Sequence, residues 1–142
     1  MLPLKDIRNR LEAAAVPGIK RVLGATQLST AIERGQFTGD AYVALQSRNG
    51  GPNTLINRTQ QRVSVRFSVI QVVRHANSES GEPQADEIEL RSEAVIAALL
   101  GWTPDSAFAP MTYVLGRLLD TDGTTAIWVD EFETSFLIRG KE

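Results

Sequence analysis

The chain has 142 residues, of which 42% are hydrophobic and 23% are charged. This length and composition are typical of one folded domain with a buried core, so we expect a single domain over residues 1–142. The sequence has no cysteine and one histidine, His75, which excludes disulfides, thiolate zinc sites and cysteine nucleophiles. Composition therefore points away from catalysis, and we expect no enzyme activity and no catalytic or metal-binding residue.

Charge is separated along the chain, although its sum is only −2. Arg48–His75 contains five arginines and no acid, Glu79–Glu93 contains six acids and one arginine, and Asp120–Glu133 contains five acids and no base. Folding can interleave these blocks on one solvated surface. Alternatively, a basic face of one copy meets an acidic face of the next copy.

Neither a secretory signal nor a membrane span is indicated. No apolar core of signal-peptide length follows Met1–Lys5, and the longest apolar-rich stretch, Ala94–Leu100, is too short to cross a bilayer. We therefore expect a soluble protein made in a reducing compartment, without a membrane partner.

The N-terminal third is predicted to alternate short helices and strands. Apolar residues at helical spacing from Leu4 to Ala15 predict a first helix, which Pro17-Gly18 ends. Three short elements are predicted next: a strand at Ile19–Leu23, a helix at Thr26–Arg34 and a strand at Ala41–Leu45. Gln46–Thr59 is predicted to be a long polar loop or hairpin connection.

The clearest strand is Gln61–His75, because apolar and polar residues alternate along it. The alternation slips at Val69-Ile70 and again at Val72-Val73, which predicts either a bulge or burial on both faces. Asn77–Gln84 is typical of a turn-rich connection. Ala85–Leu100 then predicts a helix, with acids in its first turns and Gly101 as its stop.

Met111–Leu119 and Thr125–Ile138 are predicted to form a hairpin, with Asp122-Gly123 as the turn. On the last strand, Ala126, Trp128, Phe132, Phe136 and Ile138 are expected on one face, and Val129, Glu131 and Glu133 on the other. The order α-β-α-β-β-α-β-β predicts an α+β fold. We expect a mostly antiparallel (mixed) sheet with helices packed on one face.

The acids near the C-terminus suggest either a calcium loop or a pair of catalytic carboxylates. In both cases we favour a noncatalytic interpretation without a metal ion. Asp120–Gly123 resembles the start of a calcium loop, but the residues before its twelfth position, Glu131, are typical of a strand. Asp130, Glu131 and Glu133 could supply paired carboxylates, but without an identifiable partner we interpret Glu131 and Glu133 as a solvated or interface face. His75 is interpreted as a surface or capping residue, and no hydrolase or nucleotide-binding motif is present.

A row of arginines lies on one strand. Arg62 and Arg66 are on its polar face, with Arg58 just before it and Arg48 in the loop. Such a row can face water, an acidic neighbour or a phosphate backbone, and the lack of alternating aromatics argues against direct nucleic-acid binding. The charge blocks and the loop supply our candidate interface residues: Arg48, Asn53, Arg58, Arg62, Arg66, Arg74, Asp86, Glu87, Asp120, Asp122, Glu131 and Glu133.

Five segments carry a resemblance to a known family: Leu11–Gly18 (LEAAAVPG), Gln61–Phe67 (QRVSVRF), Ala98–Pro104 (ALLGWTP), Gly116–Asp120 (GRLLD) and Trp128–Phe132 (WVDEF). In this order and spacing they resemble the small tail terminator proteins of Mu-like phages and prophages. The resemblance covers nearly the whole chain, and it includes no catalytic signature.

This resemblance implies a structural protein without a cofactor. Tail terminators form a ring, usually a hexamer, on the last ring of the completed tail tube, and the ring then docks to the connector at the head. The implied partners are other copies of the chain, the tail tube protein and the head–tail connector or stopper, with genome DNA passing through the lumen without sequence-specific binding. The implied location is the tail–neck junction of the virion, after synthesis in the cytoplasm of the bacterial host.

Two other functions remain open. Another neck protein, such as a head–tail stopper or tail-completion protein, shares the small size, the ring assembly and the lack of chemistry. A small hydrolytic or ligand-binding α+β domain belongs to a different class, and it would need a pocket with converging polar groups.

Overall fold

A computed structural model describes residues 2–26, 29, 41–74, 82–121 and 125–141, and the statements below concern these residues. The elements in chain order are α1 (Leu4–Ala13), β1 (Val22–Gly24), β2 (Ala41–Gly50), β3 (Gln60–Arg74), α3 (Glu82–Leu99), β4 (Thr112–Thr121) and β5 (Thr125–Arg139). The five strands form one sheet in the order β1-β2-β3-β5-β4. β1 pairs with β2 in parallel and the other neighbours are antiparallel, which confirms the predicted α+β fold.

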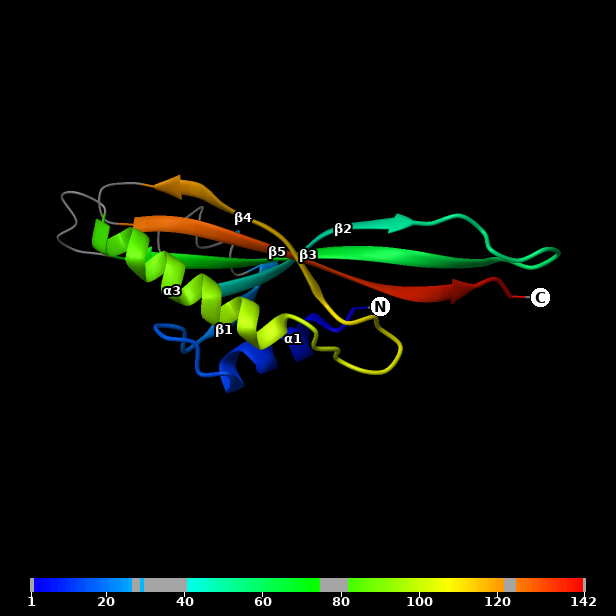
Figure 1. Cartoon of the computed structure of the whole chain (residues 1–142), viewed down its shortest axis with the longest axis horizontal. Helices are drawn as coiled ribbons and strands as arrows, with labels where there is room; N and C mark the ends of the chain where they lie inside the picture. The colour runs from blue at the N-terminus through cyan, green and yellow to red at the C-terminus, as the bar shows by residue number, and fades with distance from the viewer. Residues whose placement is uncertain (1, 27–28, 30–40, 75–81, 122–124, 142) are drawn as a thin grey trace.

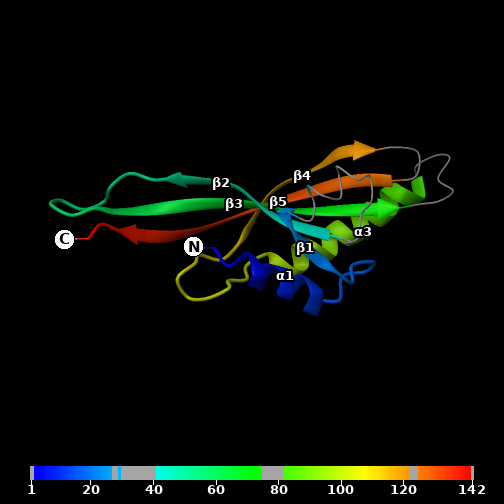
Figure 2. The same cartoon turned by 180° about the vertical axis from the view of Figure 1, so that it is seen from behind.

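Both described helices pack on the same face of the sheet (Figures 1 and 2), as predicted. Helical spacing brings Ile7 and Leu11 of α1 onto this face, and both are fully buried. They share a core with Leu99 of α3 and with Phe67 and Phe132 of the sheet. Each large apolar side chain buried in this way contributes about 1.5–3 kcal/mol, so this layer dominates the stability of the fold.

The central strand β3 is buried on both faces near its C-terminal end. Val69 belongs to the core under the helices, whereas Ile70 and Val72 pack with Tyr42 and Val129 in a second cluster on the opposite face. Of the two explanations predicted for the doubled apolar residues, burial on both faces is confirmed. The pairing of β3 with β5 runs without a register shift, so the predicted bulge is wrong there.

The strand predicted at Ala41–Leu45 is twice as long as expected, since β2 continues to Gly50. A register shift between Leu45 and Ser47 lets the strand go on, and Gly50 still pairs with Val63. Pairing with β3 satisfies the backbone of this polar segment, and such pairing outweighs weak strand propensity. The predicted loop at 46–59 is therefore confined to 51–59.

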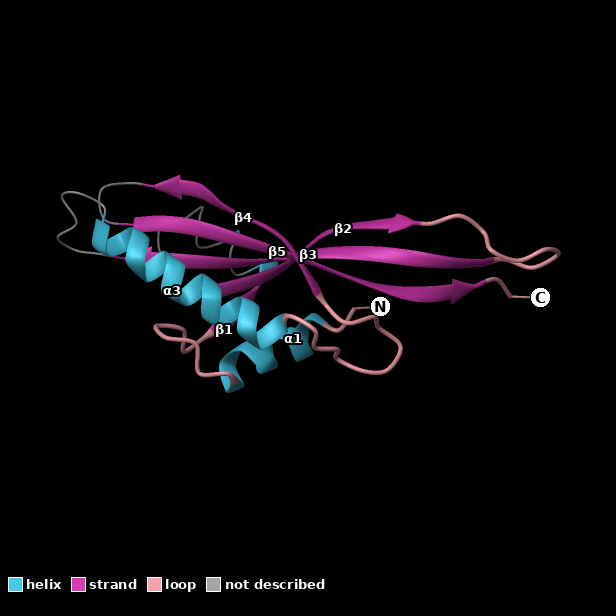
Figure 3. Cartoon of the chain, in the orientation of Figure 1, coloured by secondary structure: helices cyan, strands magenta, loops and turns pink. Residues whose placement is uncertain are grey.

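The remaining boundaries shift slightly. β1 is shorter than the strand predicted at Ile19–Leu23, and α3 begins at Glu82 instead of Ala85. The hairpin of β4 and β5 is confirmed (Figure 3). The helix predicted at Thr26–Arg34, most of the connection at 77–84, His75 and the turn at Asp122-Gly123 lie largely or wholly outside the described residues.

Candidate functional site

Three strands project beyond the helices as an arm, which extends to the right in Figure 1 and to the left in Figure 2. The arm comprises residues 45–66 and 133–141. It forms because both edge strands stop near the middle of the sheet: β1 makes its last pair between Gly24 and Val43, and β4 pairs with β5 from Thr112 and Glu133 onward. Beyond these points only β2, β3 and β5 continue.

The base of the arm has a small core of its own. Phe108, from the loop after α3, packs edge-on against Phe136 of β5, with ring centres 5.5 Å apart. Val63 and Val65 of β3 complete this cluster. Other apolar side chains of the arm remain in water, including Leu137 (43% exposed) and Ile138 (44% exposed). Exposed apolar side chains gathered on one projection are typical of a contact surface.

One asparagine holds the tip of the arm, residues 51–59. The Asn53 amide group donates hydrogen bonds to the carbonyl oxygens of Leu55 (3.0 Å) and Arg58 (2.9 Å). Its oxygen accepts from the backbone N–H groups of Leu55 (3.3 Å) and Gln60 (2.8 Å). Asn53, a predicted interface residue, therefore bridges the two sides of the tip.

The ordered tip presents apolar side chains to water. Asn57 has a φ of 65°, a left-handed conformation that asparagine adopts more readily than most residues. Leu55 is 40% exposed and Ile56, at the tip, is 89% exposed. Sequence reasoning missed both residues, because an apolar pair inside a polar loop has no periodic pattern.

The arm carries four of the predicted basic interface residues: Arg48, Arg58, Arg62 and Arg66. Arg66 Nε donates to Glu133 Oε2 at 2.8 Å, and Arg62 donates to Ser135 Oγ at 3.0 Å. Arg66 and Glu133 come from different charge blocks, so folding does interleave the blocks at this pair. Both side chains remain partly exposed, and such pairs contribute about 0–1 kcal/mol.

The other predicted charges lie apart from the arm. Asp86 and Glu87 are on α3, where Glu87 accepts a hydrogen bond from Arg91 Nε at 2.8 Å. Asp120 is near the end of β4, and Arg74 is the last residue of β3. Asp122 lies outside the described residues. The described candidate residues are therefore divided between the arm and elements outside it, and their role at an interface stays a prediction.

The structure corrects the predicted position of Glu131. It is 4% exposed, and it accepts a hydrogen bond from Gln46 Nε2 at 3.0 Å, while Arg117 Nε lies 3.9 Å from the same carboxylate oxygen. Ser68 in turn donates to Gln46 at 3.3 Å. The solvated face predicted for Glu131 is wrong, because β5 is an internal strand and side chains of β2, β3 and β4 cover it.

Asp130 is fully buried on the helix side of the sheet. Its Oδ1 accepts hydrogen bonds from Ser92 Oγ (2.9 Å), Tyr113 Oη (2.8 Å) and Trp128 Nε1 (3.0 Å). Its Oδ2 accepts one from Gln71 Nε2 at 3.2 Å. The donors come from α3, β4, β5 and β3, so this carboxylate ties four elements together.

This carboxylate centre has the features of a structural site. Asp130 and Glu131 point to opposite faces of β5 and do not form the carboxylate pair considered for acid–base chemistry. Burial and the hydrogen bond to Asp130 raise the pKa of Tyr113 to about 12, so its hydroxyl remains a donor at neutral pH. A Cβ at Gly116 would collide with the Tyr113 hydroxyl and with Trp128, so glycine is required for this approach.

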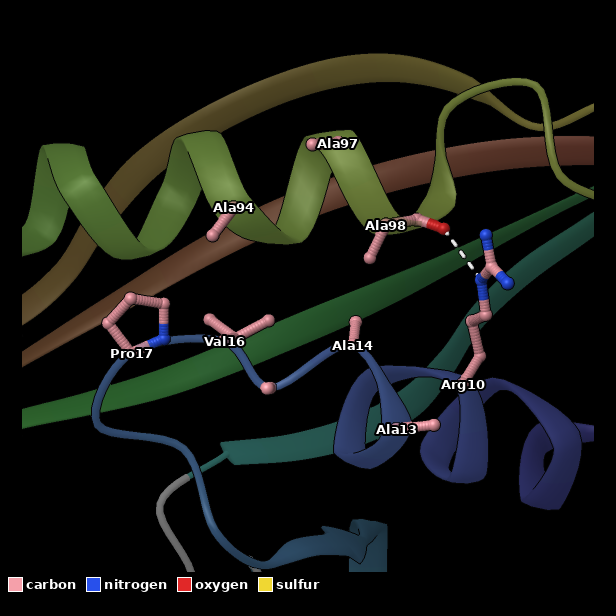
Figure 4. Close-up of a pocket in the computed structure, with 9 residues that line it drawn as sticks. Arg10, Ala13, Ala14, Val16, Pro17, Ala94, Ala97 and Ala98 are labelled. Atoms are coloured by element: carbon pink, nitrogen blue, oxygen red, sulfur yellow. Dashed lines mark hydrogen bonds between the residues drawn. The ribbon is translucent and has the colours of Figure 1, made fainter.

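A hollow of about 450 Å³ lies between the end of α1 and α3. Figure 4 shows that alanines form most of its wall, with Arg10 at one end. Arg10 Nε donates to the carbonyl oxygen of Ala98 at 3.0 Å, and its guanidinium lies 5.4 Å from the ring centre of Trp102. The arginine thus joins the two helices, and the lining supplies no acid or nucleophile.

A second hollow, of about 510 Å³, runs between α3 and the edge strand β4, and we call it the α3–β4 groove. Its lining is mainly apolar and includes two exposed acids, Glu89 and Glu93. The lining residues are Ala85, Ile88, Glu89, Ser92, Glu93, Ile96, Tyr113, Leu118 and Trp128.

In the described part of the chain, no three His, Cys, Asp or Glu side chains come together as a potential metal site. Across the same residues, no helix combines the length and the apolar character needed to cross a membrane.

The sequence matches the phage tail terminator protein family over residues 1–142. Among solved structures, a chain of the virion of a native gene transfer agent particle has a similar fold, with a TM-score of 0.50 and 13% identity over 94% of this chain and 92% of that chain. Among curated proteins, none matches this chain. At 13% identity the structural likeness concerns the fold alone, whereas the family match covers the whole chain. The chain therefore belongs to the phage tail terminator family.

Proposed function

We propose that copies of this chain close into a ring that caps the tail tube when the tube is complete, and that the ring then joins the tail to the head connector. Membership of the family makes the chain a structural component of a phage tail. The observation that carries the proposal is the arm, which lies at one end of a single copy (Figure 1) and exposes apolar and basic side chains to water. Assembly would bury this surface.

The unlike ends of the molecule support a ring rather than an isolated dimer. The basic arm lies at one end of the long axis and the acid-bearing helix α3 at the other (Figure 1). Contacts between unlike surfaces are head-to-tail, and they close into rings when the rotation permits. We expect a hexamer, with the tail tube protein on one side and the connector or stopper on the other.

The proposed ring has no chemical step and needs no cofactor. Among the described residues, Asp130 is the carboxylate best shielded from water, and it already accepts hydrogen bonds from four donors. Genome DNA would pass through the lumen without sequence-specific contacts, and a lumen without many basic residues would let it slide. The proposed location is the tail–neck junction of the virion, after synthesis in the cytoplasm of the bacterial host.

Removing the protein from an assembling phage tests this function. We expect overlong, unterminated tails in electron micrographs, with normal lengths restored by the wild-type gene supplied in trans. Tails of normal length beside separate, filled heads would contradict the capping role. That result would favour a head–tail stopper or another joining protein.

A further inference from the structure

We propose that the tip of the arm of one copy docks into the α3–β4 groove of the next copy, with Ile56 as its apolar anchor. This inference rests on the ring of the proposed function and names the contact that would build it. The partner is therefore a second copy of this chain.

The tip has the properties of a preorganised anchor. Ile56 is 89% exposed, so a partner that covers it removes most of its apolar surface from water, which favours binding. The hydrogen bonds of Asn53 already fix the loop that carries it. Docking therefore costs little additional conformational entropy, and the buried area contributes more fully to binding.

The α3–β4 groove has the properties of a matching socket. It offers about 510 Å³ between a helix and a strand, with Ile88, Ile96 and Trp128 in its lining. Leu118, on the β4 side, is 50% exposed. A volume of this size accepts an isoleucine side chain together with part of the loop that bears it.

Charge identifies the occupant as the arm of another copy. The arm carries six basic residues and one acid, Glu133; the basic residues are Arg48, Arg58, Arg62, Arg66, Arg139 and Lys141. Glu89 and Glu93 line the groove, and the same helix also carries Asp86 and Glu87 against the single base Arg91. Opposite charges around an apolar contact steer the encounter and fix its register. The lining of the hollow between α1 and α3 contains no acid, so it fits the arm less well.

Geometry makes the contact intermolecular. In Figures 1 and 2 the tip lies at one end of the long axis, and α3 and β4 lie toward the other. A copy therefore cannot place its own tip in its own groove. Each copy instead offers one tip and one groove, which is the requirement for a head-to-tail ring.

Cross-linking tests this contact directly, because the chain has no cysteine of its own. Ile56→Cys and Leu118→Cys are made in separate copies of different mass, mixed, and treated with a short bismaleimide. We expect a mixed dimer. The matched control replaces Leu118→Cys with Leu100→Cys, which is 55% exposed just beyond α3 and outside the groove. Equal yields of mixed dimer from the two mixtures would overturn the proposal.

A second measurement does not depend on cross-linking geometry. Ile56→Ser is expected to weaken self-association about tenfold or more, whereas Ile56→Leu retains it, because a hot-spot anchor contributes through its apolar bulk. Leu100→Ser is the control, and thermal unfolding shows whether each variant is folded. If Ile56→Ser associates and terminates tails like the wild type, the docking is wrong and the ring stands. If the wild type itself neither forms rings nor terminates tails, the proposed function fails.

Discussion

β2, β3 and β5 run through both the arm and the rest of the molecule, which we call the body, yet different surroundings stabilise the two regions. Where β3 lies in the body, residues 67–73 are all buried, on both faces. Where it lies in the arm, buried Val65 alternates with Arg66, whose side chain is 42% exposed. The body therefore holds itself together through its core, whereas the arm leaves surface that one copy cannot bury.

Because of this difference, substitutions in the body and in the arm should impair different properties of the protein. A change in the body should cost unfolding free energy, because buried groups lose their partners. A change in the arm should leave the folded state almost intact and reduce assembly. The predictions below test that separation, beginning with the largest expected effect.

Asp130→Ala should destabilise the body most. It removes the acceptor of the buried Ser92 hydroxyl and of the partly buried Tyr113 and Trp128 donors, and the lost hydrogen bonds together are expected to cost roughly 3–5 kcal/mol of unfolding free energy. Urea denaturation followed by circular dichroism measures the loss. Asp120→Ala, at an exposed position of β4, is the matched control and should change stability by less than about 0.5 kcal/mol. A similar loss of stability in both variants would contradict the role of Asp130 in holding the four elements together.

Gly116→Ala should also destabilise the body, but less. The added methyl group would displace the Tyr113 hydroxyl or Trp128, and such overpacking costs about 1–3 kcal/mol. Denaturation midpoints measure the effect. Gly50→Ala, whose nearest neighbour would be a flexible glutamine side chain at 3.4 Å, is the control in the arm. An unchanged denaturation midpoint for Gly116→Ala would mean that the side chains around Asp130 can shift to accommodate the methyl group.

Tyr113 should make the stability of the body fall as the pH rises in the alkaline range. Its pKa is raised from 10.0 to about 12 by burial and by its hydrogen bond to Asp130. Its contribution is therefore fully present below pH 10 and is lost as the pH rises toward 12. Comparing the chain with Tyr113→Phe across this interval isolates the effect. Parallel pH profiles of the two proteins would contradict it.

Asn53→Ala should loosen the tip of the arm and leave the body unchanged. The N–H groups of Leu55 and Gln60 lose their acceptor, so their hydrogen exchange should accelerate about tenfold, the factor that corresponds to one net hydrogen bond. Amides of the body core should keep their rates. Slow exchange at the tip in the variant would mean that other contacts order this loop.

The smallest expected effect concerns the ion pair of the arm. A double-mutant cycle of Arg66→Ala and Glu133→Ala should give a coupling of about 0–1 kcal/mol, because both side chains are partly in water. A coupling above that range would show that the arm is stabilised like the body. High salt should reduce whatever coupling is measured.

Patterns within single segments predicted much of the fold. Alternation predicted β3, the helical stripe predicted α3, and the turn residues predicted the hairpin of β4 and β5. The second half of β2 was missed, because Ser47–Gly50 has no apolar alternation and becomes a strand only by pairing with β3. Strand length at such a place depends on the partner rather than on local propensity.

The candidate surfaces were predicted less completely. The arginines of the arm followed from the basic block, but Ile56 and the α3–β4 groove did not. A groove formed by a helix and a strand that are separate in sequence has no local signal. Glu131 was misplaced for a related reason: alternation assigns it to a face of β5 and says nothing of the Gln46 and Arg117 side chains that cover this face.

The sequence by itself determined the α+β class, the main elements, the separation of charge and the resemblance to tail terminators, because each depends on residues close together or on their order along the chain. Tertiary structure alone decided which charges pair, which carboxylate is buried among donors from four elements, and where the sheet extends beyond its helices. Those features depend on which segments lie side by side. The order of the strands therefore places a polar segment and part of the basic block in an arm, and Ile56 is exposed at the tip of that arm.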